Sequence, residues 1–420
     1  MGPDAKDSLA YRRALVDTLR RDSHLRSPRV ESALLAVPRE LFVPGVPLDE
    51  VYRPSDAIVI KRVDGVSVSS ASAPEVIALM LEQLDPRPGE RVLEIGAGTG
   101  YNAALLAHMV GDAGRVITID IDEDLVLSAR EHLADAGYRS VSVVQADGAL
   151  GHLEQTARSY DRIILTVASS DIPPAWREQL ARPHGRLVMP LALRGLQRCV
   201  AFQTDGECLI GASPRACSFI GLRGLLGMAP PRMPLDQEGN WTLGGDDELL
   251  PLDPATVGQL LARPMRARPT GISTSLEEVR LGLHLWLAAH DPYIYTVWAA
   301  ARLPDLFGLT DRAGARGTLC LLDAATAGAS LAVLAWADES ACAGELCILT
   351  PGGGEASADR LQGLLAEWVT AGRPTDAALA IHACARTSPE AESAAQAAEP
   401  DEVRIDQRWT RFTLRWRRTV

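Results

Sequence analysis

Three glycines at alternate positions, Gly96, Gly98 and Gly100, stand between the apolar run VLEI and a stretch with helical spacing. A glycine turn between a strand and a helix lets the backbone approach a nucleotide-like cofactor closely. The dinucleotide fingerprint G-x-G-x-x-G would need a third glycine at position 101, which is Tyr101. The spacing G-x-G-x-G after Glu94 instead favours S-adenosylmethionine, which has no pyrophosphate to seat on a helix N-terminus. The pattern therefore predicts a methyltransferase rather than a dehydrogenase.

Acidic residues end the next two predicted strands. Asp120 stands where a carboxylate can accept hydrogen bonds from both ribose hydroxyls, and Asp147-Gly148 stands where a side chain can reach the adenine amine. Both aspartates could simply cap strand ends, but their places at successive carboxyl ends of strands favour cofactor binding. The predicted cofactor site consists of Glu94, Gly96, Ala97, Gly98, Gly100, Asn102, Asp120, Ile121, Asp147 and Gly148.

The elements that must position these residues alternate between strand and helix patterns. Amphipathic helices are predicted in the first fifty residues, one of them with Ser27 as N-cap and Pro28 at its first position. The predicted strands are VLEI, GRVITIDID, SVSVVQAD, YDRIILTVAS and GRLVMPLAL. This order predicts a doubly wound, Rossmann-like α/β domain with a parallel sheet over residues 1–225.

Residues 226–420 have a different pattern, which predicts a separate C-terminal α+β domain. A helix over TSLEEVRLGLHLWLAAH opens with a possible capping box between Ser275 and Glu278, and ADRLQGLLAEWVTAG is another helix. The predicted strands are GTLCLLD, SLAVLAWAD, ELCILT, AALAIHACA and RWTRFTLRWRR. The acidic segment 388–402 is predicted to be a loop.

Composition narrows the classes of function. The net charge of −12 argues against nucleic acid as a partner, because phosphate-tracking surfaces are basic. No apolar run is long enough to span a membrane and the first residues lack a signal-peptide pattern, so a cytoplasmic protein is expected. The cysteines form no CxxC pair and no metal site is predicted; we interpret them as buried thiols.

Four segments resemble the protein-L-isoaspartate O-methyltransferase family, and the resemblance covers roughly residues 10–200. They are VPRELFVP (37–44), VLEIGAGTGYNAALLA (92–107), VVQADGALG (143–151) and YDRIILTVASSDIPPAWREQL…GRLVMPL (160–191). The resemblance implies methyl transfer from S-adenosylmethionine to the side-chain carboxylate of an aspartyl or isoaspartyl residue, with S-adenosylhomocysteine as product. Such a carboxylate is already ionised at neutral pH, so no general base is expected.

The family carries a Ser-Gln-Pro that opens a helix over the substrate site. The matching residues are Ser72, Ala73 and Pro74, so the serine and proline are kept while alanine replaces glutamine. The resemblance implies that Ser72 is the catalytic-site residue that hydrogen-bonds the acceptor carboxylate; a role as helix N-cap is equally compatible with its place before Pro74.

The length of the chain is a second departure from the family pattern. Repair enzymes of the family end near the fifth to seventh strands of this sheet, whereas nearly half of this chain follows them. The layout resembles long variants associated with ribosomally made peptides, the lanthipeptides and graspetides. It implies methylation of one Asp in a cyclised precursor peptide, leading to an aspartimide that either persists or hydrolyses to isoaspartate. General isoaspartyl repair and a non-catalytic peptide-binding protein with a vestigial cofactor site are the alternatives. RWTRFTLRWRR is interpreted either as a half-buried edge strand or as a docking surface for an acidic peptide.

Overall fold

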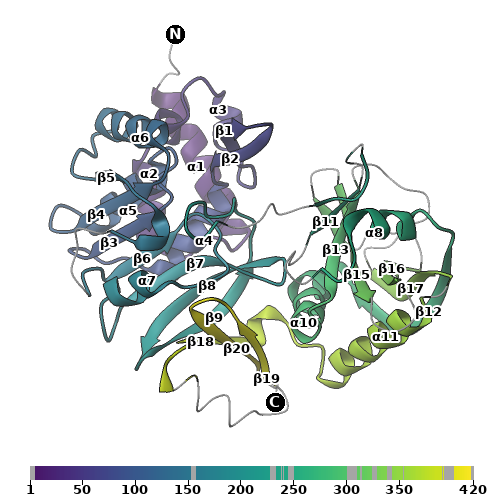
Figure 1. The fold of residues 1–420 in the computed structure, drawn as a ribbon. Coiled ribbons are helices and arrows are strands. Elements are labelled where there is room, and N and C mark those ends of the chain that lie inside the picture. Colours follow the sequence, from purple (N-terminus) through teal and green to yellow (C-terminus); the bar gives the residue numbers. More distant parts are fainter. Residues whose placement is uncertain are drawn as a thin grey trace.

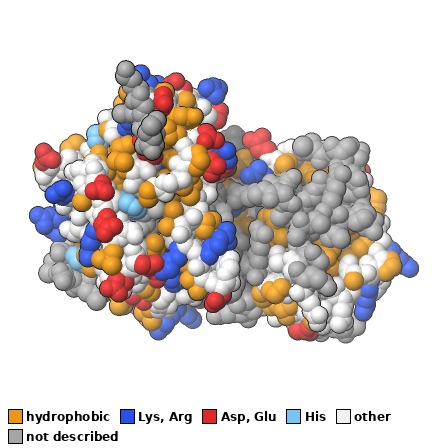
Figure 2. Space-filling view, turned by 90° about the horizontal axis from the view of Figure 1, so that it is seen from above, with side chains coloured by type: hydrophobic (Ala, Val, Ile, Leu, Met, Phe, Trp, Pro, Cys, Tyr) orange, Lys and Arg blue, Asp and Glu red, His pale blue; other side chains and the backbone are white. Residues whose placement is uncertain are grey.

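The computed structural model describes residues 5–152, 158–227, 233–237, 239, 241–244, 250–299, 310–312, 315–323, 329–337, 343–352, 354–389, 391 and 402–417. Figure 1 shows two lobes, the first built around a ten-stranded sheet and the second around an eight-stranded sheet. On the face shown in Figure 2, acidic and basic side chains of the first lobe are mixed, and no continuous basic surface is visible among its described residues.

The first sheet contains the five parallel strands that the sequence predicts. They are β3 (Arg91–Ile95), β4 (Arg115–Asp120), β5 (Ser142–Gln145), β6 (Arg162–Leu165) and β7 (Arg186–Leu193), in the order β7-β6-β3-β4-β5. Most interior residues of β3, β4, β6 and β7 are Val, Ile or Leu and are buried, as expected for strands covered on both faces. The predicted doubly wound, Rossmann-like fold is confirmed.

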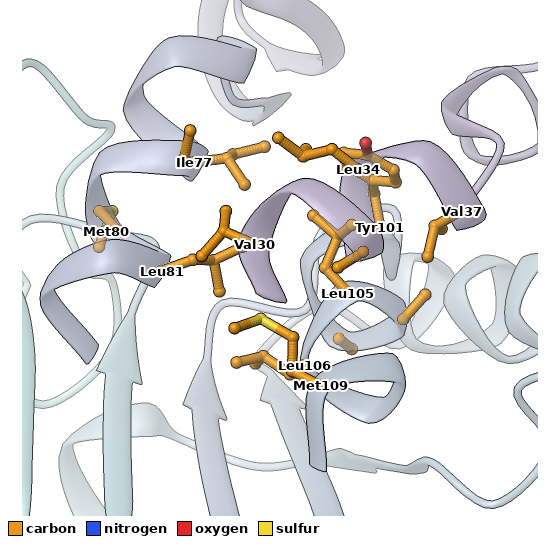
Figure 3. Packing of buried hydrophobic residues seen from close by; sticks show 14 of the residues in the cluster. Val30, Leu34, Val37, Ile77, Met80, Leu81, Tyr101, Leu105, Leu106 and Met109 are labelled. Atoms are coloured by element: carbon orange, nitrogen blue, oxygen red, sulfur yellow. The ribbon is translucent and has the colours of Figure 1, made fainter. Parts of the chain in front are cut away.

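Helices cover both faces of this sheet. They are α1 (Ala5–Arg21), α2 (Pro28–Ala36), α3 (Leu48–Val51), α4 (Pro74–Leu84), α5 (Tyr101–Val110), α6 (Glu123–Asp135) and α7 (Pro174–Gln179), with 3₁₀ turns at Arg39–Phe42 and Gly148–Leu150. Ser27 is the N-cap of α2 with proline after it, as predicted. Apolar side chains of α2, α4 and α5 interlock on one face (Figure 3), and Val92 joins that cluster, whereas Leu93 packs on the other face with Trp176 of α7.

A two-stranded hairpin that was not predicted follows α3 in the chain and precedes α4. Its strands are β1 (Ile58–Val63) and β2 (Val66–Ala71), joined by Asp64 and Gly65, which both have positive φ. An Asp-Gly pair between short apolar-polar runs is a hairpin signal. The hairpin leads directly into Ser72 and α4.

The other half of the first sheet is antiparallel. β8 (Leu196–Asp205) and β9 (Cys208–Ala216) follow β7, and then β18 (Leu379–Ala385), β20 (Thr410–Trp416) and β19 (Glu402–Asp406) complete the order. The structure therefore corrects the predicted boundary, because β18, β20 and β19 belong to the sheet of the first lobe. It also corrects the interpretation of RWTRFTLRWRR as an edge strand, since β20 lies between β18 and β19.

The second lobe lies between β9 and β18 in the chain. Its strands are β10 (Met233–Pro234), β11 (Trp241–Gly244), β12 (Met265–Ser275), β13 (Ile294–Ala299), β14 (Thr310–Arg312), β15 (Ala315–Asp323), β16 (Ser330–Trp336) and β17 (Ala343–Pro351). Its helices are α8 (Pro254–Leu261), α9 (Leu276–Glu278), α10 (His284–His290) and α11 (Glu355–Thr370), with a π-helical turn at Val279–Leu283 and a 3₁₀ turn at Asp376–Ala378. The predicted capping box between Ser275 and Glu278 is confirmed. The predicted acidic loop lies largely outside the described residues.

Buried polar and aromatic contacts join the two lobes. Arg198 of β8 donates to Asp376 at 2.6 Å and to the carbonyl of Arg280 at 3.2 Å. Trp286 of α10 meets Trp416 of β20 edge-on, with ring centroids 5.0 Å apart. Removal of either partner of a buried ion pair leaves the other charge buried and uncompensated, which is costly. The pair of Arg198 and Asp376 therefore holds the two lobes together.

Two of the cysteines differ from the prediction of buried free thiols. Cys208 of β9 and Cys384 of β18 form a disulfide across a sequence separation of 176 residues. Cys199, Cys217, Cys320 and Cys347 are buried thiols outside any disulfide, as predicted. The disulfide joins the family-like strands to the strands that return after the second lobe.

No helix among the described residues is long and apolar enough to cross a membrane.

Candidate functional site

The glycine turn between β3 and α5 has the backbone shape that only glycine adopts easily. Gly96 and Gly98 have φ values of +103° and +50°. A Cβ atom on Gly96 would come within 2.6 Å of the Thr166 hydroxyl, so a side chain there would displace the end of β6. The amides of Gly96 and Ala97 donate to the carbonyl of Ile119 at 2.8 and 3.1 Å. The turn is thereby fastened to the carboxyl end of β4.

Asp120 lies beside this turn, as predicted. One carboxylate oxygen accepts the amide of Gly98 at 3.0 Å, and the other accepts the amide of Asp122 at 3.2 Å. Burial raises the pKa of Asp120, although both backbone hydrogen bonds favour the ionised form. Each oxygen keeps a second lone pair for an outside donor. The half-buried Ile121 follows it, and its carbonyl accepts from Gln145 at 3.3 Å.

Glu94 and Asn102 lie beneath the turn rather than on its surface. Glu94 is fully buried, and the Asn102 amide donates to it at 2.7 Å. Burial raises the pKa of Glu94 to about 7, while the neighbouring Thr118 and Asn102 offset part of that shift. The contact ties the end of β3 to the first turn of α5. In this structure Glu94 therefore supports the turn from inside the core.

Asp147 lies at the next strand end and binds two backbone amides. It caps the 3₁₀ turn by accepting from Ala149 at 2.9 Å, and it accepts from Leu225 at 2.7 Å. The carbonyl of the buried Gly148 accepts from Trp176 of α7 at 2.8 Å. The capping role considered for Asp147 is therefore present, and residues 224–225 lie against the predicted adenine end of the site.

Ser72 lies at the end of the hairpin, held by a residue that the sequence analysis did not single out. The fully buried Arg39, from the segment VPRELFVP, donates to the carbonyls of Val51 at 3.0 Å, Ala71 at 3.4 Å and Ser72 at 2.9 Å. Its guanidinium lies 5.0 Å from the ring centre of Tyr101, the first residue of α5. Burial lowers the pKa of Arg39. Arg39 thus fixes Ser72 relative to the glycine turn.

The structure assigns the helix N-cap before Pro74 to Ala73 and not to Ser72. The alternative role of Ser72 as N-cap is therefore wrong. Within the described residues its half-buried hydroxyl has no protein partner, which leaves it available to an acceptor carboxylate. The preceding serines lie close to the turn, with Ser69 Oγ and the Ser70 carbonyl each 3.9 Å from the place of a Cβ on Gly98.

Ion pairs of Asp122, two residues after Asp120, tie two distant segments of the chain to the predicted cofactor site, and sequence reasoning missed them. Asp122 accepts from Lys61 of β1 at 2.9 Å and binds Arg223 through two contacts of 3.1 and 2.7 Å. Lys61 also reaches Asp124 at 2.7 Å. Arg223 and then Lys61 hold the pKa of Asp122 below its usual value. These partners are 61 and 101 residues away in the chain, so no local pattern could indicate them.

The described residues of the site therefore combine a glycine turn, carboxylates at two strand ends and a serine held by Arg39, and none of them forms an acid–base pair. This set suits positioning of a nucleophile that is already ionised.

Comparison with known proteins agrees with this geometry. The model of the protein-L-isoaspartate(D-aspartate) O-methyltransferase family matches residues 10–226. A Methanopyrus kandleri protein-L-isoaspartate O-methyltransferase is 39% identical over 233 residues, which make up 54% of this chain and 99% of that protein. The chain belongs to this family. A Hyperthermus butylicus member is 38% identical over 239 residues, covering 54% of this chain and 95% of its own.

A solved protein-L-isoaspartate O-methyltransferase has a TM-score of 0.49 and 24% identity, covering 88% of this chain and 96% of its own. A Plasmodium falciparum structure with S-adenosyl-L-homocysteine has a TM-score of 0.44 and 19% identity, covering 50% of this chain and 97% of its own. As a protein-L-isoaspartate O-methyltransferase family member, the chain is a carboxyl methyltransferase that acts on a protein substrate, and S-adenosylmethionine is its methyl donor.

Proposed function

We propose that this methyltransferase acts on the side-chain carboxylate of an Asp in a cyclised ribosomal precursor peptide. The observation that carries the proposal is the second lobe, residues 226–378. The Methanopyrus kandleri relative aligns over 99% of its length with only 54% of this chain, so the lobe has no counterpart in it. A lobe fixed to the methyltransferase by a buried ion pair is suited to holding a folded substrate.

In the proposed reaction, a carboxylate oxygen of the acceptor forms a bond to the methyl carbon, and the bond from that carbon to sulfur breaks. Bound S-adenosylmethionine supplies a methyl group on a positively charged sulfur, which leaves as a neutral thioether. Ser72 would hydrogen-bond the acceptor carboxylate. The turn at Gly96, Ala97, Gly98 and Gly100 would approach the amino-acid part of the cofactor, Asp120 the ribose and Asp147-Gly148 the adenine.

The product then explains the use of a ring-constrained substrate. A methyl ester carries a methoxide leaving group, which the ionised carboxylate lacks. The backbone amide nitrogen of the next residue attacks the ester carbon, closes a five-membered succinimide and releases methanol. A ring that holds this amide near the ester raises its effective concentration. Aspartimide, or isoaspartate after addition of water, is the expected end product.

General isoaspartyl repair is the second candidate, and the family match over residues 10–226 favours it. Ala73 counts against general repair and in favour of the precursor peptide. The glutamine that the family carries at this place, beside the acceptor, is absent here. The third candidate is a non-catalytic peptide-binding protein with a vestigial cofactor site. Calorimetry with S-adenosylhomocysteine tests it, because such a protein would not bind this ligand. We further propose a cytoplasmic location and no nucleic-acid partner, in keeping with the net charge of −12.

Mass spectrometry of two substrates tests the proposal. The full-length protein is incubated with S-adenosylmethionine and either a linear isoaspartyl peptide or a macrocyclic peptide with an Asp in its ring. The expected result is a transient gain of one methyl on the macrocycle, followed by loss of methanol to a peptide one water lighter. Efficient methylation of the linear peptide alone would favour repair. Ser72→Ala should slow transfer, and the control Ser140→Ala, at an exposed position, should not.

A further inference from the structure

A pocket of about 620 Å³ lies where α7 meets the turns that precede β20 and follow β18. Its walls include four arginines, two glutamates and one tryptophan: Arg177, Arg182, Arg386, Arg408, Glu178, Glu207 and Trp409. The volume is in the range of pockets that enclose small ligands or several side chains. None of these residues belongs to the predicted cofactor site.

The pocket extends to the edge of the sheet opposite the glycine turn. Arg186, the first residue of β7, pairs with Gln203 of β8, so the β8–β9 turn lies beyond the amino ends of the parallel strands. Arg182 contacts that turn, donating to the carbonyl of Gly206 at 3.0 Å and to Glu207 at 2.6 Å. The glycine turn follows the carboxyl end of β3. The pocket is therefore a second site, separate from methyl transfer.

Among the described residues that line the pocket, four arginines stand against two glutamates, Glu178 and Glu207. Glu207 neutralises Arg182. Arg177 is only 9% exposed, and it donates to the neutral carbonyl of Ala383 and the hydroxyl of Thr410, each at 3.0 Å. Burial lowers the pKa of Arg177 to about 10, so it remains charged at neutral pH. The nearby charge of Asp171 offsets part of that shift. An anion bound from outside would compensate the buried guanidinium further.

The remaining two arginines are exposed around an aromatic wall. Arg386 donates to the carbonyl of Gln407 at 3.2 Å, and the Arg408 guanidinium lies 4.5 Å from the ring centre of Trp409. In the part of the chain that the structure describes, no carboxylate forms a direct ion pair with Arg177, Arg386 or Arg408, and Arg386 acts on the Asp406 carboxylate through its charge alone. The amide of Trp409 donates to Asp171 at 2.8 Å, which anchors the wall to the loop before α7.

We propose that this pocket binds the carboxylate side chains of an acidic stretch in the peptide substrate. The proposal rests on the proposed function, since it assigns the pocket to the same peptide. Guanidinium groups match carboxylates in shape and charge, and the half-buried Trp409 ring offers an apolar wall that suits a peptide better than a small inorganic anion. A protein of net charge −12 repels acidic peptides generally, so it needs a local basic site to hold one.

Binding of a defined acidic probe tests the proposal. Fluorescein-labelled hexaglutamate is titrated with the full-length protein at low ionic strength, and its anisotropy is measured. Arg386→Gln with Arg408→Gln changes two exposed positions. The matched control is Arg266→Gln with Arg268→Gln on β12, which removes the same charge from two exposed arginines. The expected result is a Kd at least about tenfold higher for the pocket variant and an unchanged Kd for the control.

Three outcomes would overturn the proposal: no binding of hexaglutamate, equal weakening in both variants, or displacement by sulfate but not by chloride at equal ionic strength. The last would identify a site for small oxyanions. Circular dichroism of the pocket variant confirms that it is folded. Failure of the wild-type protein to bind S-adenosylhomocysteine would count against the proposed function and leave the pocket result intact, because the probe does not touch the glycine turn.

Discussion

The guanidinium of Arg39 donates to the carbonyl oxygen of Ser72 at 2.9 Å from a fully buried position. This contact links the segment VPRELFVP to the acceptor side of the candidate site, and the same guanidinium lies against Tyr101 at the start of α5. One side chain therefore sets the distance between the serine and the glycine turn. Arg39 is a positioning residue, because it acts through Ser72.

Arg39→Met should lower the free energy of unfolding by about 2–4 kcal/mol, because buried carbonyls lose their donor. It should also raise the KM for the acceptor peptide more than it weakens S-adenosylhomocysteine binding. Urea unfolding and steady-state kinetics measure these effects. Arg39→Lys should not restore the wild-type values, since one ammonium cannot replace the planar fork. The exposed Arg53→Met is the control, and an equal KM change in both variants would contradict the positioning role.

Asp120→Asn should weaken S-adenosylhomocysteine binding by about 10- to 100-fold, the range expected for loss of a charge-assisted hydrogen bond. Asparagine can still accept the Gly98 amide, so the turn should keep its shape. Isothermal titration calorimetry measures the change, with the exposed Asp135→Asn as control. Unchanged affinity would show that Asp120 serves the turn and not the ribose.

Glu94 should make the protein less stable as pH rises. Its pKa of about 7 in the folded state exceeds its ordinary value of 4.5, so the folded protein binds the proton more tightly than the unfolded chain. The free energy of unfolding should therefore fall between pH 4.5 and 7, by on the order of 3 kcal/mol from this residue. Glu94→Gln keeps an acceptor for Asn102 and removes the titration.

The difference in stability between Glu94→Gln and the wild type should thus grow from near zero at pH 4.5 to its full value at pH 8. Urea unfolding at several pH values measures it. The exposed Glu131→Gln should show no such trend. A pH-independent difference would mean that the pKa of Glu94 is the same in the folded and the unfolded protein.

Cys208→Ser should lower the free energy of unfolding by about 2–4 kcal/mol under oxidising conditions, as is typical when a disulfide across a long loop is removed. In dithiothreitol the wild type should become as labile as the variant. Alkylation of the denatured protein followed by mass spectrometry reports whether the bond is present in cells. Two alkylated thiols at these positions would agree with a reducing cytoplasm, where structural disulfides are rare.

The parallel half of the first sheet could be predicted because its signals are local. Each of these strands is a short apolar run, and glycines or acidic residues mark the ends of several of them. The β8–β9 hairpin also carries a local signal, Asp205-Gly206 between apolar runs, which the sequence analysis did not use. The sheet to which β18 and β20 belong could not be predicted, because β-strand pairing across 170 residues leaves no pattern in the sequence.

The candidate site divides in the same way. The glycines, Asp120 and Asp147 follow from their places at strand ends. Arg39 did not, because a charged residue in an apolar motif gives no sign of being buried. The pairing of Asp122 with Lys61 and Arg223 depends on tertiary structure alone. Glu94 is the opposite case to Arg39. Its position in the sequence predicts a cofactor ligand, but its side chain lies in the core.

The return of β18, β19 and β20 to the first sheet sets the order in which the molecule can be built on the ribosome. The family-like part of the chain is translated first, yet β9 keeps an open edge until residues 379–416 have emerged. The second lobe is translated in between, and its eight-stranded sheet is formed from contiguous chain. We therefore expect the middle of the chain to mature before the methyltransferase sheet is complete, with chaperones guarding the open edge in the interval.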